Sequence, residues 1–509
     1  MSFARDPSKW LEEAATLPQR PFLRTPQGRE VSYAALRDLS GRMAAALQQR
    51  GVRPGDRVAV QVEKSAEAVF LYVACLRMGA VFVPINVANT PNEVEYFLHD
   101  CAPRVVVIRP QDRALIEPLA RNAGADFVET LGVEADGSLC EIAARCPDFD
   151  IPGEADPQSI AAIIYTSGTT GRAKGAMLTR DNLASNAAVL VDAWRFSEKD
   201  VLLHTLPLFH IHGLFVAINT VLASASSLLL LPKFDAAQTL DHLSSASVYM
   251  GVPTHYTRLL QQQNLGRHST ATVRLFVSGS APLLAETHRE FLQRTGHVIL
   301  ERYGMSETMM NTSNPYEGVR LAGSVGPPLR GISMRVTNTE TGALEPQADV
   351  IGTLQVRGPN VFAGYWRDEE KTRAEFTPDG WFKTGDVGRI DRNGYVHIVG
   401  RAKDLVISGG YNVYPKEVET ELDSVEGVLE SAVFGVPHPD FGEGVTAAVV
   451  AKAGAVLSED SIIEAVKERL ARYKVPKRIL LVEELPRNAM GKVQKNALRK
   501  MFAALYANR

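Results

Sequence analysis

The sequence predicts an α/β protein with a large N-terminal body of helix-covered sheets plus a small β-barrel, and a smaller, mobile α+β C-terminal domain. Three observations carry this prediction. First, short apolar strands alternate with helical segments from about Val31. Second, another run of this kind covers about 160–310. Third, from about Gly323 the predicted strands are short and Gly and Pro are frequent. Alternating strands and helices are typical of parallel sheets covered by helices.

The first run begins with a helix and continues as an alternation. Apolar residues recur at helical spacing over 33–50, and Gly51 suits the position just after a helix. The next segments are predicted in turn as strand, helix, strand, helix and strand, at 57–62, 65–79, 80–86, 91–101 and 104–110. Within the second run, Val201 to Pro232 carries no charge, but histidines, prolines and Asn219 keep it from reaching about 18 consecutive apolar residues. We therefore interpret it as buried core and not as a membrane span.

In the C-terminal part, the alternation of strands and helices gives way to successive short strands. Strands at 332–338, 350–358 and 395–401 indicate a small antiparallel barrel or sheet. A segment at 401–419 then joins a last unit of about 100 residues, which mixes helices with strands. We expect an N-terminal domain over 1–402 and a C-terminal domain over 403–509, connected near Lys403.

Composition narrows the function classes. The 509 residues are 45% apolar and 22% charged, and Lys+Arg 55 against Asp+Glu 58 leaves a net charge of −3. That balance lacks the basic surplus of a nucleic-acid or membrane-surface binder. Four cysteines without a C-x-x-C pair argue against a disulfide scaffold or a structural zinc site. No signal peptide is apparent, so we expect a cytoplasmic protein.

The strongest motif is IIYTSGTTGRAKG, over 163–175. An apolar strand enters a loop of Thr, Ser and Gly that ends at Lys174. Glycines let successive backbone N–H groups converge on one anion, hydroxyls add donors, and the lysine adds a charge. This is the chemistry of a phosphate-binding loop, although the spacing is not that of a Walker A motif. The alternative is a solvated turn.

Three weaker motifs lie further along the chain. ERYGMSET, over 301–308, offers Tyr303 for stacking a base and Glu307 as an oxygen ligand for Mg²⁺. TGDVGRIDRNGYVHIVGRAKD, over 384–404, offers Asp386 and Arg401 as contacts for ribose hydroxyls. LPRNAMGKVQKNALR carries Lys492 in a loop-like segment. Each alone could equally be a surface loop or hairpin with routine charges.

Together, in this order and spacing, these motifs resemble the adenylate-forming superfamily of acyl-CoA synthetases, adenylation domains and luciferases, over nearly the whole chain. The resemblance implies that the chain binds ATP, Mg²⁺ and coenzyme A as a co-substrate. It implies Mg²⁺-side roles for Thr166 and Glu307, and a catalytic Lys492 that bridges the carboxylate and the α-phosphate. The nucleotide-binding residues it implies are Thr166, Ser167, Gly168, Thr169, Thr170, Gly171, Lys174, Glu301, Tyr303, Thr308, Asp386, Arg401 and Lys492.

The resemblance also implies movement. In that superfamily the C-terminal domain rotates between the two half-reactions, about a residue that matches Lys403. Gly409 and Gly410 would then lie beside the thiol tunnel. Lys492 is expected to be exposed in a flexible loop, so reversible acylation that removes its charge follows as a hypothesis for an off-switch.

The acyl pocket departs from the common pattern. Arg302 stands before Tyr303 where many relatives carry a small residue, and Arg258 follows a second pocket segment. Ser280 and His210 complete the predicted polar lining, whereas His212 is interpreted as a loop histidine. A buried cation needs an anionic partner, so two arginines favour a substrate with a second carboxylate. The VGVPT-like segment, RLFVSGSAPL and ERYGMSET with MNTSNPY together resemble malonyl-CoA synthetases. This resemblance predicts malonate as the substrate and leaves methylmalonate open.

Four alternatives stay open at this point. The arginines could pair with Glu301 or Glu307 and leave a neutral pocket. The enzyme could be a CoA ligase for a short-chain or aromatic monocarboxylate, or an adenylation enzyme that loads a carrier protein. The chain could also be a binding protein without catalysis.

Overall fold

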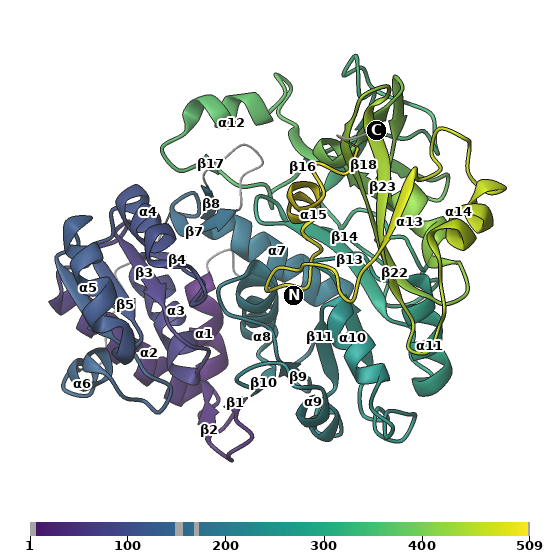
Figure 1. Cartoon of the computed structure of the whole chain (residues 1–509). Helices are drawn as coiled ribbons and strands as arrows, with labels where there is room; N and C mark the ends of the chain where they lie inside the picture. The colour runs from purple at the N-terminus through teal and green to yellow at the C-terminus, as the bar shows by residue number, and fades with distance from the viewer. Residues whose placement is uncertain (1–6, 148–155, 167–172, 507–509) are drawn as a thin grey trace. The chain divides into compact units, whose positions relative to one another are not determined.

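The segments predicted as strands between 57 and 110 share one mixed sheet in the computed structural model, which describes residues 7–147, 156–166 and 173–506. This β3 sheet runs in the order β17-β8-β7-β4-β3-β5-β6 (Figure 1). Its strands are β3 (Arg57–Gln61), β4 (Val81–Pro84), β5 (Val105–Ile108), β6 (Phe127–Thr130), β7 (Ile160–Thr166), β8 (Lys174–Thr179) and β17 (Gly364–Tyr365). β3 pairs in parallel with β4 and β5, whereas β7 and β8 are antiparallel.

Helices cover the β3 sheet, and their sequences fit their surroundings. α3 (Ala66–Met78) is buried along its whole length, which explains why it has no polar face. α4 (Pro91–Cys101) and α5 (Arg113–Asn122) contribute apolar side chains to the core on one face of the sheet. Thr90 and Glu93 form a capping box at the start of α4. The other elements of this region are α1 (Pro7–Ala15), α2 (Tyr33–Gln49), η1 (Pro110–Asp112) and α6 (Ser138–Ala143).

A second sheet brings together the carboxyl ends of several parallel strands. This β11 sheet runs in the order β14-β13-β12-β11-β9-β10-β1-β2. Its strands are β1 (Pro21–Arg24), β2 (Glu30–Ser32), β9 (Val201–His204), β10 (Ser227–Leu230), β11 (Val248–Gly251), β12 (Leu275–Ser278), β13 (Leu300–Met305) and β14 (Met309–Ser313). β9, β11, β12 and β13 are parallel neighbours, so their carboxyl ends meet at one edge, where open α/β sheets commonly bind ligands.

Helices also surround the β11 sheet. They are α7 (Arg180–Ala193), the π-helical segment η2 (His212–Ile218), α8 (Asn219–Ser224), α9 (Ala236–Leu243), α10 (Pro253–Leu260) and α11 (Ala285–Thr295). α9, α10 and α11 enclose an apolar core against one face of the sheet. The uncharged stretch 201–232 folds as strand, loop, helix and strand, as predicted. Over the described ranges, no helix has the length and apolar character needed to cross a bilayer.

The strands predicted after Gly323 form a small antiparallel sheet. Its order is β15-β16-β18-β19, with β15 and β19 at the edges. Its strands are β15 (Ser333–Thr337), β16 (Gly352–Arg357), β18 (Phe382–Ile390) and β19 (Val396–Arg401), and α12 (Glu369–Glu375) lies between β17 and β18 in the chain.

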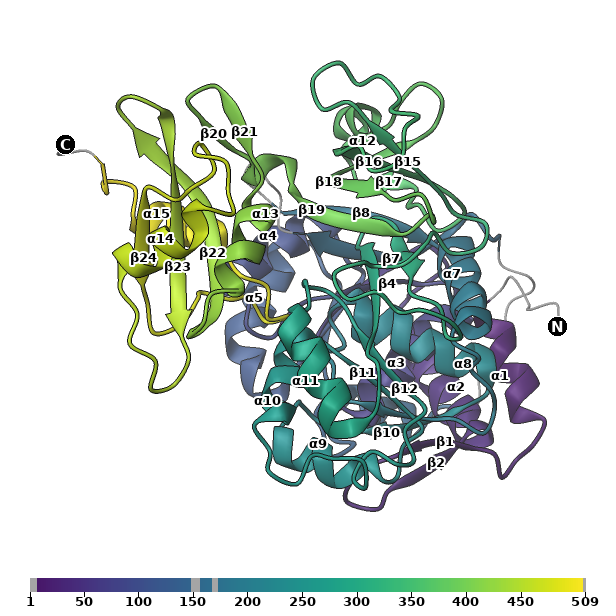
Figure 2. The same cartoon turned by 90° about the vertical axis from the view of Figure 1, so that its right-hand side faces the viewer.

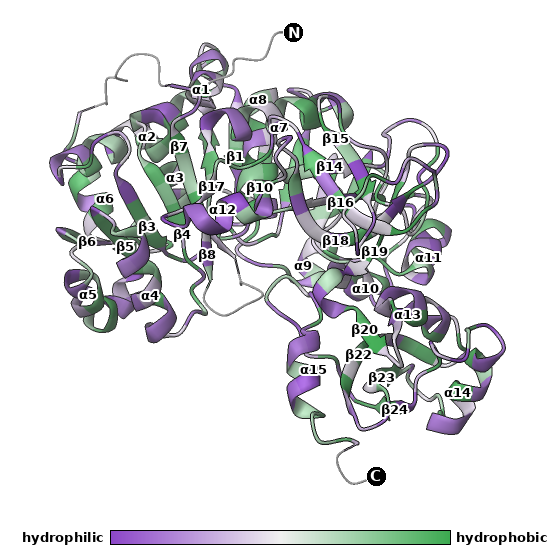
Figure 3. Cartoon of the chain, turned by 90° about the horizontal axis from the view of Figure 1, so that it is seen from above, coloured by the Kyte–Doolittle hydropathy of each residue, from purple (hydrophilic) through white to green (hydrophobic). Residues whose placement is uncertain are grey.

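The last part of the chain is α+β, as predicted. Its sheet runs β21-β20-β23-β22, with β24 parallel to β23 (Figure 2). Valines and isoleucines of this sheet pack against α13 and α14. The elements are η3 (Ala402–Asp404), β20 (Val406–Ser408), β21 (Tyr411–Val413), α13 (Pro415–Asp423), β22 (Val428–His438), β23 (Gly442–Ala451), α14 (Glu459–Lys467), β24 (Arg478–Leu481) and α15 (Lys495–Met501). Figure 3 shows apolar strands and polar outer helices such as α4 and α15.

The chain divides into two compact units. The first reaches Ser333 and includes Val356–Phe382, and the second comprises Met334–Gln355 with the chain from Lys383 onward. The predicted boundary between residues 402 and 403 therefore falls inside the second unit. It stays a prediction about where the chain pivots, which this division does not test.

Candidate active site

An antiparallel ladder holds the two described ends of the phosphate loop. Thr166 is the last residue of β7 and lies opposite Lys174, the first residue of β8. The predicted loop residues between them, Ser167, Gly168, Thr169, Thr170 and Gly171, lie outside the described residues. Strand pairing thus sets the spacing between the hydroxyl and the ammonium that begin and end the motif.

Tyr365 connects Lys174 with Glu307 in the first unit. The Lys174 ammonium lies 5.5 Å from the centroid of the Tyr365 ring, and the Tyr365 hydroxyl donates a hydrogen bond to Glu307 Oε1 at 3.1 Å. Desolvation, and then the neighbouring Lys371, lower the pKa of Lys174. The sequence analysis missed Tyr365, because β17, which carries it, is far from both partners in the chain.

β13 and the turn that follows it carry the other predicted nucleotide residues of the first unit. Glu301 and Thr308 are buried, and Tyr303 is half-buried. Glu301 Oε1 accepts a hydrogen bond from the Gly323 backbone at 3.3 Å. β13 and its turn therefore hold Glu301, Tyr303 and Glu307 within one short segment of the first unit.

Arg302 is a buried cation that has unpaired hydrogen-bond donors. Its side chain lies against the Gly279 backbone, where an added Cβ would be 2.4 Å from the Arg302 Cζ atom. Its Nε and Nη2 atoms are buried without a hydrogen-bond partner, and no carboxylate among the described residues forms an ion pair with it. Burial lowers the pKa of Arg302 to about 9, so the guanidinium keeps its charge at pH 7. The alternative that Arg302 pairs with Glu301 or Glu307 is not what the structure shows.

Ser280 and the two neighbouring histidines lie in the same unit. Ser280 follows β12 by two residues and has a positive φ of 71°, a strained conformation for a residue other than glycine. Its hydroxyl is 3.3 Å from Nδ1 of His212. His210 is half-buried and accepts a hydrogen bond from the His212 backbone at 3.2 Å. His212 is fully buried, so its interpretation as a loop histidine is wrong.

Arg258 differs from Arg302. It lies in the last turn of α10 and is exposed, because this helix directs His255, Tyr256, Leu259 and Leu260 into the core and presents Arg258 on another face. The expectation of two buried arginines is therefore wrong for Arg258. A cation in the last turn is favourable for the helix dipole, which gives Arg258 a local structural role.

Asp386 and Arg401 form a pair in the second unit. They are partners across the β18–β19 ladder, and Arg401 Nε lies 2.6 Å from Asp386 Oδ1. Asp386 is buried and Arg401 half-buried. The structure thus joins the two residues that the sequence analysis assigned to the ribose.

Lys492 lies in the same unit, in the exposed turn before α15. Its backbone N–H donates to Asn488 Oδ1 at 2.9 Å. Desolvation, and then the Arg401 guanidinium, lower the pKa of Lys492 although the residue as a whole is exposed. The predicted pivot residue Lys403 lies in η3 and is exposed, and Arg499 of α15 binds the adjacent Asp404 at 3.0 Å.

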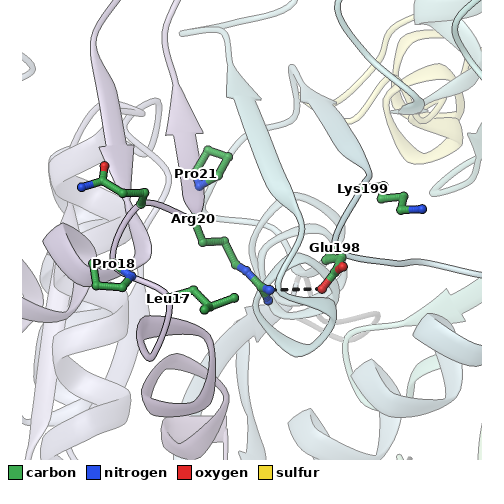
Figure 4. A pocket seen from close by; sticks show the side chains of 7 residues that line it. Leu17, Pro18, Arg20, Pro21, Glu198 and Lys199 are labelled. Atoms are coloured by element: carbon green, nitrogen blue, oxygen red, sulfur yellow. Dashed lines mark hydrogen bonds and ion pairs between the residues drawn. The ribbon is translucent and has the colours of Figure 1, made fainter.

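A surface pocket elsewhere shares no residue with this site. It has a volume of about 410 Å³ and lies between the turn after α1 and the turn before β9 (Figure 4). Its lining includes the ion pair between Arg20 and Glu198, at 3.1 Å. None of its lining residues was predicted to bind a substrate or cofactor.

Glu307 and Thr166 carry oxygen atoms of the kind that Mg²⁺ binds. The described residues contain no cluster of three His, Cys, Asp or Glu side chains that could hold a metal by themselves. Mg²⁺ needs no such cluster, because it usually binds one or two protein oxygens, phosphates and water. The buried Glu307 carboxylate and the Thr166 hydroxyl are ligands of that kind.

Comparison with known proteins identifies the family of the chain. A family model described as AMP-binding enzyme matches residues 10–366, and one described as AMP-binding enzyme C-terminal domain matches 417–492. The crystal structure of ATP-bound MatB from Rhodopseudomonas palustris is 52% identical, with a TM-score of 0.96 and 99% of each chain covered. This chain is 35% identical to the indoleacetate–CoA ligase of Aromatoleum aromaticum, over 97% and 98% of the two chains. It is also 35% identical to the malonate–CoA ligase of Arabidopsis thaliana, over 88% and 78%.

Proposed function

The chain belongs to the AMP-binding enzymes, and from this premise we propose that it is an ATP-dependent malonate–CoA ligase. Oxygen of one malonate carboxylate attacks the α-phosphorus of ATP, and pyrophosphate leaves. The thiol of coenzyme A then attacks the acyl carbon, so that a C–S bond forms, the bond to AMP breaks and the thiol proton is released.

The observation that carries the malonate assignment is the state of Arg302. Leaving a charge buried without a partner costs several kcal/mol, so such a group is retained where a ligand supplies the opposite charge. A diacid presents a second carboxylate for this guanidinium. A monocarboxylate such as indoleacetate would leave it unpaired, which favours malonate over the activity named for that relative.

Lys174 and Lys492 reduce the electrostatic repulsion between the two anionic substrates. A carboxylate and ATP are both anionic, so their approach needs positive charge held where negative charge develops. Lys174 supplies it at the end of the phosphate loop, where its ammonium lies 5.5 Å from the centroid of the Tyr365 ring. Lys492 supplies it between the carboxylate and the α-phosphate. Asp386 and Arg401 hold the ribose as an already neutralised pair, so they orient the nucleotide without adding net charge.

Mg²⁺ would bind at the phosphate end of the site. Glu307 and Thr166 would hold the ion, which would neutralise phosphate charge when bound. Tyr365 keeps the Glu307 carboxylate oriented through its hydrogen bond.

A screen of acids tests the function. Pyrophosphate release is measured with malonate, methylmalonate, acetate, propionate and indoleacetate, with and without coenzyme A. We expect malonate to give the highest kcat/KM, and coenzyme A to be required for turnover beyond the first adenylate. A higher kcat/KM with any monocarboxylate would overturn the diacid assignment. Faster acyl transfer to a purified carrier protein than to coenzyme A would overturn the CoA ligase.

Lys492 separates the two half-reactions. In Lys492→Ala, adenylate formation should collapse while thioester formation from preformed malonyl-adenylate persists. Full adenylation activity would remove the lysine from its role.

Because Lys492 is exposed, we also propose that its reversible acylation switches adenylation off. Intact-mass analysis of protein from cells, with activity measured before and after enzymatic deacylation, tests this; unmodified protein under all growth conditions would contradict it.

A further inference from the structure

His212 is a buried polar group that the proposed mechanism does not use. It begins the π-helical segment η2 and is 0% exposed. Its Nδ1 atom is 3.3 Å from the Ser280 hydroxyl, whereas its Nε2 atom is buried without a hydrogen-bond partner among the residues that the structure describes. Buried polar atoms are nearly always paired, so an unpaired imidazole nitrogen needs an explanation.

The charges around His212 are all of one sign or neutral. Its electrostatic neighbours, from four different elements or loops, are Arg302, His210, His204 and His255, and Arg302 has the largest effect. Burial and these neighbours lower the pKa of His212 well below its usual value, so the imidazole is neutral at pH 7. It therefore offers one donor and one acceptor.

The Ser280 hydroxyl is the hydrogen-bond partner of Nδ1, and the direction of that bond determines which nitrogen carries the proton. When that hydroxyl donates to Nδ1, the proton of the neutral ring lies on Nε2, which then becomes an unused N–H donor. Ser280 is held at a positive φ, so its hydroxyl is directed by a backbone conformation that costs energy to maintain. Arg302 shows the same pattern. Its side chain lies against Gly279, the neighbour of Ser280, and its Nε and Nη2 atoms are buried without acceptors among the described residues.

We propose that His212 binds the distal carboxylate of the diacid through Nε2–H, beside Arg302, with Ser280 as the residue that orients the ring. The assignment rests on the proposed function, since it needs a substrate with a second carboxylate. It adds a neutral donor to the charged one. Arg302 supplies the charge, and His212 fixes the direction from which a carboxylate oxygen is bound.

Two substitutions at position 212 separate this role from packing. Asparagine places its amide near the position of Nδ1 and keeps a partner for Ser280, but it does not reach the position of Nε2. Glutamine places its amide near the position of Nε2. His268→Asn, in an exposed histidine of the same unit, is the matched control.

We expect His212→Asn to raise KM for malonate by at least about 10-fold, as for a lost hydrogen bond to a charged group. kcat at saturating malonate should change less than about threefold, and KM for propionate should stay within about twofold. His212→Gln should recover most of the malonate affinity. Titration calorimetry of malonate in the presence of a non-hydrolysable ATP analogue should show the same order of affinities without turnover.

The inference fails if His212→Asn leaves KM for malonate unchanged, or raises KM for propionate equally. Should His212→Asn not bind the ATP analogue because it is misfolded, Ser280→Ala gives the second measurement. This variant should weaken malonate but not propionate, and an equal effect on both would also overturn the inference. Failure of the proposed function looks different: wild-type enzyme would then prefer monocarboxylates, and Arg302→Met would not lower malonate turnover.

Discussion

Two arginines in this chain show opposite solutions to burying a guanidinium group. Arg401, in the second unit, lies 2.6 Å from the buried carboxylate of Asp386. Arg302, in the first unit, is more deeply buried and has no carboxylate partner within the described part of the chain. The paired arginine suits a neutral ligand such as ribose, which needs orientation more than charge. The unpaired one suits an anion. The absence of a carboxylate partner, and not the arginine alone, therefore indicates that the ligand is an anion.

Removing the unpaired guanidinium of Arg302 should have the largest effect on kcat/KM for malonate. Arg302→Met keeps the length of the side chain but removes its charge and donors, so kcat/KM for malonate should fall at least about 100-fold. ATP binding should persist, because the nucleotide residues are separate. Steady-state kinetics and an ATP-analogue titration measure both.

Arg258→Met is the matched control for that variant, since it makes the same change in an exposed arginine. We expect less than about a threefold change in kcat/KM. An equal loss in the two variants would return Arg258 to the pocket and remove the contrast between buried and exposed arginines.

Breaking the ion pair between Asp386 and Arg401 should have a smaller effect, and it should change KM for ATP and not the preference among acids. Asp386→Asn leaves Arg401 without its partner and should raise KM for ATP about 10-fold to 100-fold, as expected for a truncated buried pair. The effect should be the same whether the acid is malonate or propionate. A variant that changed the ranking of the acids would show that the two regions are not independent.

A smaller shift is expected in the pH dependence of adenylation. Lys492 is charged below its pKa, and this pKa is lowered by desolvation and by Arg401. Adenylate formation should therefore decline at a lower pH than that of an ordinary lysine as pH rises. Lys492→Arg should move the alkaline limb of the pH–rate profile upward, even if it lowers the plateau. An unmoved limb would mean that another group titrates there.

The smallest expected effect concerns stability. Folding lowers the pKa of Arg302 to about 9, so the folded state disfavours the charged form. This cost is fully present at pH 7 and diminishes as pH rises through about 9, because the unfolded chain then holds more protons than the folded one. Arg302→Met without ligand should therefore melt at the same temperature or a few degrees higher. Malonate should raise the Tm of wild type but not of the variant.

The architecture was largely predictable from sequence because it depends on periodicity. The apolar runs at 57–62, 80–86 and 104–110 became β3, β4 and β5, and the mostly apolar segment predicted as a helix at 65–79 became the buried helix α3. Grouping of 334–355 with the C-terminal chain was not predictable, because it arises from long-range pairing in the small sheet.

Single side chains of the site were harder to predict. Arg302 follows from its place in a motif on β13, but the exposure of Arg258 depends on which face α10 turns to the core. His212 was misread because nothing local distinguishes a buried histidine from an exposed one. Its proximity to Ser280 joins segments 68 residues apart.

The close approach of Arg302 to Gly279 links two positions for anyone who wishes to redesign this enzyme. A methyl group at 279 and a guanidinium at 302 would occupy the same space. Replacing Arg302 with a small residue opens that space, and only then does alanine at 279 become tolerable. Libraries that vary either position alone will miss such solutions, whereas paired libraries will sample them.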